Sequence, residues 1–197
     1  MIDEVIQREW DFFQDVHHID GRASCQDDFD TFNKQRSAQF KVFSDELLKS
    51  YLNDLREYKK IGRNPIMEKY AYMMETSDPE YFSTIQKDLP PITLPQRQII
   101  DTICQIQVDM REQFNQKYPH LASLSRTTHT QDDQKEDTSF ETYLRGELMT
   151  YSPHTLYLYG QMIIQMVEEH QNITMLIMQN TVKEYGYQSL EDAEMKS

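Results

Sequence analysis

The chain has 197 residues, about the length of one domain, and its 33 acidic residues outnumber the 20 Lys and Arg. The net charge of -13 leaves no basic face to neutralise phosphates, so nucleic-acid binding is disfavoured, and it repels anionic membrane surfaces. Five Gly and seven Pro are too few for the many tight turns of a β-sandwich or barrel. The two cysteines provide no disulfide framework.

Targeting features are absent from the pattern. The chain opens Met-Ile-Asp-Glu-Val, with acids where a signal peptide carries bases, and no apolar core follows. No run approaches the ~18 apolar residues of a membrane span. We therefore expect a soluble, cytoplasmic protein that neither spans nor binds a membrane.

Hydrophobic periodicity predicts the fold class. Apolar residues recur about every 3.6 residues and strand-type alternation is almost absent, so we expect an all-α protein of about 8–10 helices. The expected helices cover about residues 2–16, 28–43, 45–61, 65–76, a short stretch from 78, 96–118, 140–150, 153–169, 173–185 and a short stretch from 189.

Local signals set the expected helix ends. Ser44 is a typical N-cap, Gly62 follows its helix as a C′ glycine, and Pro65 fits the first helical position. Ser77-Asp-Pro-Glu80 has the form of a capping box. The Pro-rich residues 89–95 are expected to be a non-helical linker, and residues 123–137 a polar, mobile loop.

The second set of helices repeats the first. Phe29-Asp-Thr-Phe32 matches Phe140-Glu-Thr-Tyr143. In each copy an acidic residue stands where a helix start favours one, and in the second copy Thr138 and Glu141 have the spacing of a capping box. Further matches pair Tyr51 with Tyr159 and Asn64 with Asn172. We therefore expect one domain over residues 1–197, built from pseudo-repeats of about 1–95 and 96–197 that are related by a pseudo-twofold axis, with a site at their junction.

Three charged residues fall on apolar helical stripes. Glu9 projects into the middle of the first helix's apolar arc. Arg36 lies at the centre of the stripe formed by Phe29, Phe32, Phe40 and Phe43, and Glu147 occupies the matching place in the second copy. A buried, unpaired charge costs several kcal/mol, so we expect Arg36 and Glu147 to pair across the two halves, with Glu9 nearby.

Three interpretations of these charges stay open. They form a buried ion pair that fixes how the halves dock, or they line a polar pocket for a ligand or substrate. In the third interpretation, the long side chains reach water at the edge of the stripe.

The segment Gly21-Arg-Ala-Ser-Cys-Gln-Asp-Asp28 concentrates reactive side chains before the second helix. Cys25 could act as a nucleophile near a helix start, with Arg22 favouring the thiolate and His17 or His18 as base. Asp27 and its neighbour oppose a thiolate. We favour the interpretation in which an aspartate caps the helix and Cys25 packs as a small apolar side chain.

Metal signatures are weak. His17 and His18 are adjacent, so on a helix they point about 100° apart and chelate poorly. The sequence has no Glu-x-x-His, HExxH or closed Cys/His zinc spacing. We expect no metal and no cofactor; a metal held by Glu9, Asp27 and one of these histidines stays as an alternative.

Several stretches together resemble an uncharacterised bacterial family, domain-of-unknown-function family 4125. They are Glu9-Trp10 with Phe13, the segment from Gly21 to Asp28, the stretch Thr138-Ser-Phe-Glu-Thr-Tyr-Leu-Arg-Gly-Glu-Leu148, and Tyr185-Gly-Tyr-Gln-Ser-Leu190. The resemblance covers nearly the whole chain. It implies a bacterial protein and supplies no activity and no catalytic residue.

Two functions from different classes follow from these features. The favoured hypothesis is an acidic helical binding module that docks on a basic partner protein or holds a small ligand between its halves, as a monomer or a homodimer. The alternative is a small enzyme in which carboxylates serve as general acid or base and an arginine binds an anionic substrate by a fork of hydrogen bonds. The candidate pocket comprises Glu9, Arg36, Glu147, Arg22, Cys25, Asp27 and Arg145.

Overall fold

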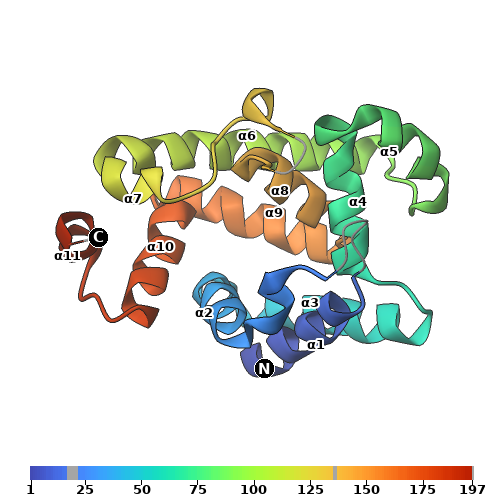
Figure 1. Ribbon diagram of the computed structural model, residues 1–197, viewed down its shortest axis with the longest axis horizontal. Helices are drawn as coiled ribbons and strands as arrows, with labels where there is room; N and C mark the ends of the chain where they lie inside the picture. The colour runs from blue at the N-terminus through green and yellow to red at the C-terminus, as the bar shows by residue number, and fades with distance from the viewer. Residues whose placement is uncertain (17–21, 135–136, 197) are drawn as a thin grey trace.

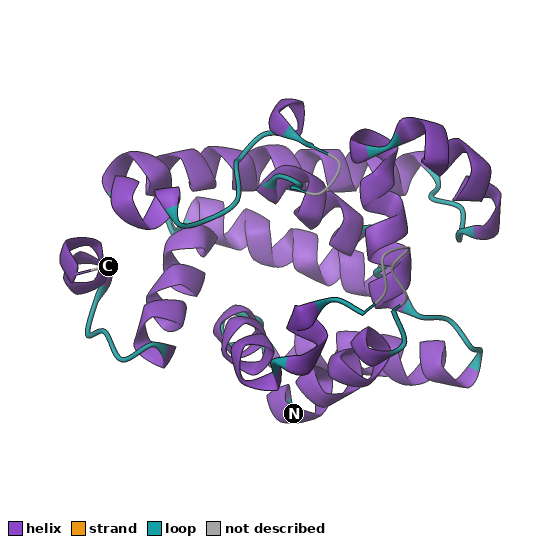
Figure 2. Ribbon diagram, in the orientation of Figure 1, coloured by secondary structure: helices purple, strands orange, loops and turns teal. Residues whose placement is uncertain are grey.

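The structure is a computed structural model that describes residues 1–16, 22–134 and 137–196. These residues form eleven α-helices and three short 3₁₀ helices, with no strand among them, so the predicted all-α class is confirmed (Figures 1 and 2). No helix in the described part of the chain is long and apolar enough to cross a membrane.

The helices of the first half follow the predicted order. They are α1 (Ile2–Gln14), α2 (Phe29–Phe40), α3 (Asp45–Lys60), α4 (Pro65–Ser77) and α5 (Pro79–Ile85), with 3₁₀ turns η1 (Ser24–Asp27) and η2 (Gln86–Asp88). The second half contains α6 (Leu94–Lys117), α7 (Pro119–Ser123), η3 (Thr130–Asp132), α8 (Phe140–Leu148), α9 (Pro153–Glu168), α10 (Ile173–Glu184) and α11 (Leu190–Lys196).

Most predicted caps are found. Asp28 caps α2 by accepting the Thr31 N–H at 3.0 Å, and Ser44 caps α3. Asn64 caps α4, where Pro65 takes the first helical position because its missing N–H is not needed there.

Three helix starts differ from the prediction. Ser139, not Thr138, caps α8, and Asp78, not Ser77, caps α5. The predicted linker is shorter than residues 89–95, because α6 already begins at Leu94. Thr93 and Gln96 form its capping box, and Pro95 is tolerated in the first turn.

The loop between α7 and α8 is anchored, and α7 itself was not predicted. The Thr130 N–H donates to Glu141 at 3.0 Å, and Asp133 accepts the Ser139 N–H at 2.7 Å. Asp133 also accepts the Thr142 hydroxyl at 2.5 Å. In the described part of residues 123–137, these hydrogen bonds hold the loop against α8, which argues against the expected mobility.

The two halves pack against each other through matched helix pairs. Helix α1 contacts α2, α3 and α4, and in the second half α6 contacts α8, α9 and α10. Between the halves, α4 packs on α8, α2 on α10 and α3 on α9 (Figure 1). One large apolar core runs through both halves, and a smaller one joins α6, α7, α10 and α11.

Hydrogen bonds repeat in the same way. Asn64 Nδ2 donates to the Phe12 carbonyl at 2.8 Å, and Asn172 Nδ2 donates to the Met110 carbonyl at 2.8 Å. The halves differ in helix lengths and in the extra helices α5, α7 and α11. The internal duplication stays a prediction, whose test is the superposition of residues 1–77 on residues 94–185.

Candidate functional site

Helices α1, α2 and α8 bring Glu9, Arg36 and Glu147 together in the core. Arg36 Nε and Nη2 donate to the two carboxylate oxygens of Glu9 at 2.7 and 2.6 Å. Arg36 Nη1 lies 3.2 Å from Glu147 Oε2. All three side chains are buried, and Glu9 is fully inaccessible. The predicted cluster of these three residues is present in the fold; its functional role is a separate question.

A shell of hydroxyls and amides completes the cluster. The Tyr51 hydroxyl donates to Glu9 at 2.6 Å, and the Tyr151 hydroxyl donates to Glu147 at 3.3 Å. Gln39 links the two partners, because its Oε1 accepts from Arg36 at 2.6 Å and its Nε2 donates to Glu147 at 3.0 Å. Buried charges are stable only with such partners, and here each carboxylate accepts several.

Lys69 of α4 is the fourth charge. Its ammonium lies 3.7 Å from Glu147 Oε2, so two buried cations, Arg36 and Lys69, face two buried carboxylates, Glu9 and Glu147. This lysine was missed from the sequence, although Ile66, Lys69 and Met73 share one face of α4, and the stripe argument used for Arg36 applies equally.

The neighbouring charges shift the pKa values of the cluster. Burial alone would raise the pKa of Glu147, but Arg36 and Lys69 outweigh it and lower the pKa to about 2. Burial opposes the charge of Arg36, and the carboxylates of Glu147 and Glu9 nevertheless raise its pKa above the ordinary value. Arg36 and Glu147 are therefore ionised at neutral pH.

A cavity of about 290 Å³ borders the charge cluster on one side. It is lined by residues of α1, η1, α2, α4 and α8 and of the loop that precedes α8. Its lining residues are Glu9, Phe13, Cys25, Asp28, Thr31, Phe32, Gln35, Arg36, Ile66, Lys69, Tyr70, Arg126 and Tyr143.

Three of the lining residues form a polar wall. Lys69 Nζ donates to the Tyr143 hydroxyl at 2.7 Å and lies 4.2 Å from the centre of that ring. The exposed Arg126 guanidinium lies 5.0 Å from the centre of the same ring. Arg126 Nη1 donates to the Thr138 carbonyl at 3.0 Å. Two cations thus flank one phenol, an arrangement typical of cation–π contacts.

Arg36 is not available to a ligand. Its Nε, Nη1 and Nη2 groups donate to Glu9, Glu147 and Gln39, which accounts for all five guanidinium N–H donors. These bonds argue against Arg36 as the arginine that would bind an anionic substrate in the enzyme hypothesis. Its fork is used inside the protein.

Two other candidate residues pair outside the cavity. Arg22 Nε donates to Asp27 at 2.9 Å, and neither residue is among those that line the cavity. Arg22 also donates to the Gln26 carbonyl, so it holds the turn before α2 in place.

Arg145 belongs to a different surface. It pairs with Asp101 of α6 and donates to Glu141 at 3.0 Å, although it stands only two positions before Glu147. Two positions along a helix correspond to a rotation of about 200°, so Arg145 points away from Glu147, and it is not among the residues that line the cavity.

Cys25 lines the cavity and is exposed, so the expectation that it packs as a small apolar side chain is wrong. It lies in η1, where Gln26 rather than Cys25 is buried: Gln26 Nε2 donates to the carbonyls of Phe13 and Val16. Cys104 is buried in α6, as expected.

The described residues contain no group of three His, Cys, Asp or Glu that could hold a metal ion. His17 and His18, which the sequence offered as ligands or as a base for Cys25, lie outside the described residues.

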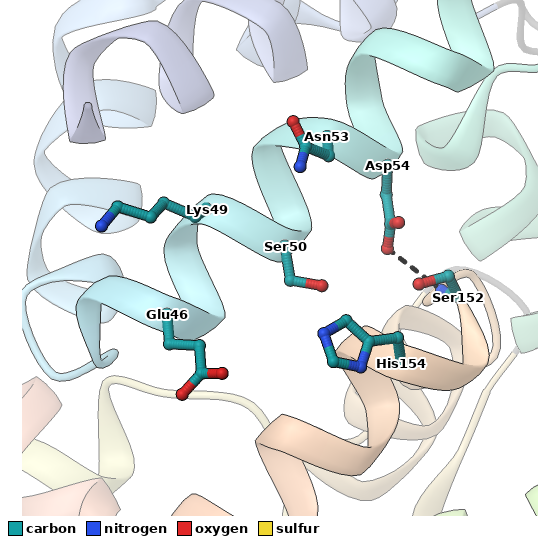
Figure 3. A pocket seen from close by; sticks show the side chains of 7 residues that line it. All are labelled: Glu46, Lys49, Ser50, Asn53, Asp54, Ser152 and His154. Carbon is teal, nitrogen blue, oxygen red and sulfur yellow. Dashed lines mark hydrogen bonds between the residues drawn. The ribbon is translucent and has the colours of Figure 1, made fainter.

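A second pocket, of about 290 Å³, lies between α3 and α9. Figure 3 shows that Glu46 and His154 face it from opposite helices, while Asp54 accepts the Ser152 N–H at 3.1 Å. Of its lining residues, Glu46, Lys49 and His154 are exposed and Asp54 is partly buried, and none of them belongs to a buried ion pair. The cavity beside the buried cluster is therefore the better candidate site.

The geometry defines an all-α protein with a buried, charge-balanced cluster of two carboxylates and two cations at the edge of a cavity. The chain belongs to the family described as Protein of unknown function (DUF4125), whose model matches residues 1–195, and the predicted resemblance is confirmed. Comparisons with curated proteins and with solved structures found no match.

Proposed function

We propose that the protein is a binding module that holds a small anionic molecule in the cavity beside the charge cluster. Of the two forms of binding expected from the sequence, a cavity of about 290 Å³ favours a small ligand over a partner protein. The carrying observation is the Lys69 ammonium, which is buried at the cavity wall with one short hydrogen bond, to Tyr143.

Charge supports an anionic ligand. The cavity is lined by three cations, Arg36, Lys69 and Arg126, against two carboxylates, Glu9 and Asp28. Arg36 and Glu9 neutralise each other, and the carboxylate of Asp28 caps α2. Glu147 balances the charge of Lys69 at 3.7 Å, so the charge that attracts a carboxylate or phosphate group comes from Arg126, and Lys69 adds ammonium N–H donors at the cavity wall, in a chain whose net charge is -13.

Size supports a small molecule. The volume of about 290 Å³ is near the lower end of the ~300–1,000 Å³ typical of ligand pockets. Phe13, Phe32 and Ile66 supply an apolar wall opposite the cations. A ligand with one anionic group and a short apolar body matches this lining.

The test is a titration of the ¹⁵N-labelled protein with succinate and with inorganic phosphate, followed by ¹H–¹⁵N NMR. We expect saturable shifts centred on the amides of Thr31, Lys69 and Tyr70. Arg126→Gln should weaken binding about tenfold, because it removes one charge-assisted hydrogen bond.

Arg56→Gln is the matched control, because Arg56 is an exposed arginine that pairs with Glu4 of α1 away from the cavity. It should leave binding unchanged. Shifts scattered over the surface, or equal losses in the Arg126 and Arg56 variants, would show nonspecific attraction to basic side chains and overturn the proposal.

The second candidate is the small enzyme, which the exposed Cys25 thiol on the cavity wall favours. In that function the Cys25 thiolate would attack the carbonyl carbon of an ester or thioester ligand held by Lys69 and Arg126, the alcohol or thiol would leave, and water would hydrolyse the S-acyl bond to free the thiol. Cys25→Ser separates the candidates. A binding module keeps its ligand affinity in this variant, whereas an enzyme that uses the thiol loses turnover of a ligand that still binds.

A further inference from the structure

Two buried side-chain polar atoms in the described part of the chain lack a hydrogen-bond partner, and both belong to α6. They are Arg111 Nε and Asn115 Oδ1. Residues four positions apart lie on the same face of a helix, so the two side chains border one place in the protein. The other end of the Asn115 amide is already used, because its Nδ2 donates to the Thr128 hydroxyl at 2.9 Å. One face of α6 therefore presents a donor and an acceptor that the described residues do not use.

Arg111 differs from the other buried cations of the described residues. The buried cations are Arg36, Lys69 and Arg111, with exposed fractions of 7%, 4% and 5%. The first two face the carboxylates of Glu9 and Glu147. Arg111 forms no ion pair with a described residue, and burial lowers its pKa below the ordinary value without a carboxylate to offset it. A buried charge without a counter-charge is costly, so Arg111 calls for an anion from outside the fold.

Two aromatic rings hold the Arg111 guanidinium in place. Its central carbon lies 5.4 Å from the centre of the Phe114 ring on α6 and 5.7 Å from that of the Phe140 ring on α8. The two helices pack on each other there (Figure 1), and the Phe140 N–H donates to the Thr127 carbonyl at 2.8 Å. Ring faces attract the positive charge, but they leave the N–H donors in the guanidinium plane without lone-pair acceptors. The guanidinium is therefore oriented and still able to donate.

The two unpaired atoms specify the chemistry of a ligand. A guanidinium presents parallel N–H groups that match the two oxygens of a carboxylate. Because Arg111 supplies a single positive charge, a ligand with a single negative charge balances it. Asn115 Oδ1 is an acceptor, so the ligand also needs a donor beside its carboxylate, and a hydroxyl group on the neighbouring carbon supplies one.

We propose that Arg111 and Asn115 bind a small 2-hydroxycarboxylate, whose carboxylate accepts from the Arg111 guanidinium and whose hydroxyl donates to Asn115 Oδ1. This Arg111 site is separate from the cavity beside the charge cluster, because none of the residues that line that cavity belongs to α6. The ligand supplies the counter-charge that the described residues do not provide.

The test is a titration of the ¹⁵N-labelled protein with glycolate, followed by ¹H–¹⁵N NMR of the Arg111 Nε–H and of the Asn115 side-chain amide. Both signals should shift saturably. Arg111→Met should weaken glycolate binding more than about tenfold, as followed through the Asn115 amide. Acetate lacks the hydroxyl and should bind about fivefold more weakly than glycolate, and Asn115→Leu should remove that difference.

Stability gives a readout that an arginine with a purely structural role would not give. Arg111→Met keeps a flexible side chain against the two rings and removes the unpaired charge, so it should raise the midpoint of thermal unfolding in buffer without glycolate. Glycolate should raise the midpoint of the native chain more than that of Arg111→Met.

Arg97→Met is the matched control on the same helix. Arg97 Nη1 donates to Glu75 at 2.7 Å, so this variant loses a paired arginine. It should gain no stability and should bind glycolate like the native chain. Arg126→Gln should also leave the Arg111 Nε–H shift unchanged, so the result does not depend on the cavity.

Three results would overturn the proposal. An Arg111 Nε–H signal that stays in place up to high millimolar glycolate would show that the guanidinium binds no such ligand. A lower unfolding midpoint for Arg111→Met than for the native chain would show that the guanidinium is satisfied inside the protein. Equal affinities for glycolate and acetate would exclude the hydroxyl contact to Asn115 and with it the proposed class of ligand.

Discussion

Arg36 and Glu147 are 111 residues apart in the chain, and their side chains pair in the core with Nη1 3.2 Å from Oε2. The same guanidinium holds Glu9, so one arginine on α2 ties α1 to α8. The contact therefore joins the first half of the chain to the second through a single buried side chain.

The pairing predicts strong coupling in a double-mutant cycle. Arg36→Met and Glu147→Leu should each cost about 3–5 kcal/mol of unfolding free energy, because Arg36→Met strands Glu9 and Glu147→Leu removes the carboxylate beside Lys69. The double variant should cost less than the sum of the two single variants. Urea unfolding of the four proteins measures the coupling directly.

Additive effects below about 1 kcal/mol in this cycle would contradict a buried pair. Arg36→Met should be the costlier single change, because it strands Glu9 and leaves Glu147 with Lys69 alone, whereas Glu147→Leu leaves Arg36 paired with Glu9.

The lowered pKa of Glu147 predicts acid sensitivity. Its pKa falls from an ordinary 4.5 to about 2 in the folded state, so the carboxylate stabilises the fold fully above pH 4.5 and loses this contribution as the pH falls through 2. Over this window the native chain should lose about 3 kcal/mol more than Glu147→Gln, which has no proton to gain. Equal losses, measured by urea unfolding at each pH, would exclude the lowered pKa.

Gly146 sets the spacing of α4 and α8. A Cβ at this position would lie 2.7 Å from Met73 Cγ and 2.9 Å from the Lys69 carbonyl oxygen, so Gly146→Ala must push the helices apart. We expect a loss of about 1–3 kcal/mol in thermal or urea unfolding. Gly160→Ala is the matched control, because its Cβ meets nothing closer than 3.6 Å and alanine favours a helix. A neutral Gly146→Ala would show that the close approach is absent.

The ends of α3 and α9 predict opposite effects of glycine. Gly62 has φ 73° and His170, 108 positions later, has φ 55°, a left-handed conformation that glycine adopts without strain. His170→Gly should therefore stabilise the protein by about 1 kcal/mol, and Gly62→Ala should destabilise it by about 1 kcal/mol. Calorimetric unfolding of both variants checks the pair, and a destabilised His170→Gly would mean that the imidazole has a contact worth more than the strain.

The two thiols should react very differently. Cys25 is exposed, whereas burial raises the pKa of Cys104 to about 12. Titration with Ellman's reagent should count one fast thiol in the native chain, none in Cys25→Ser, and two in urea. Reaction of Cys25 much faster than that of the unfolded chain would identify an activated thiol and favour the enzyme over the binding module.

The sequence by itself determined the all-α class, the helix order and most helix ends, because these depend on interactions within a few residues. Ser44, Asn64 and Gly62 mark helix ends through bonds and dihedral angles of their own backbone neighbourhood. The stripe positions of Glu9 and Arg36 were equally readable, because a charge amid apolar residues at helical spacing must be buried or reach water.

Only the tertiary structure decided what those charges do. Whether Arg36 is free to bind a ligand depends on how many acceptors surround it, and those come from α1, α2 and α8. Lys69 and Arg126 line the cavity from segments far apart in the sequence. Arg145 lies on another face of α8, where it pairs with Asp101. Helical periodicity assigns a side chain to a face, but the docking of helices through long-range packing selects its partners and leaves the space beside them open.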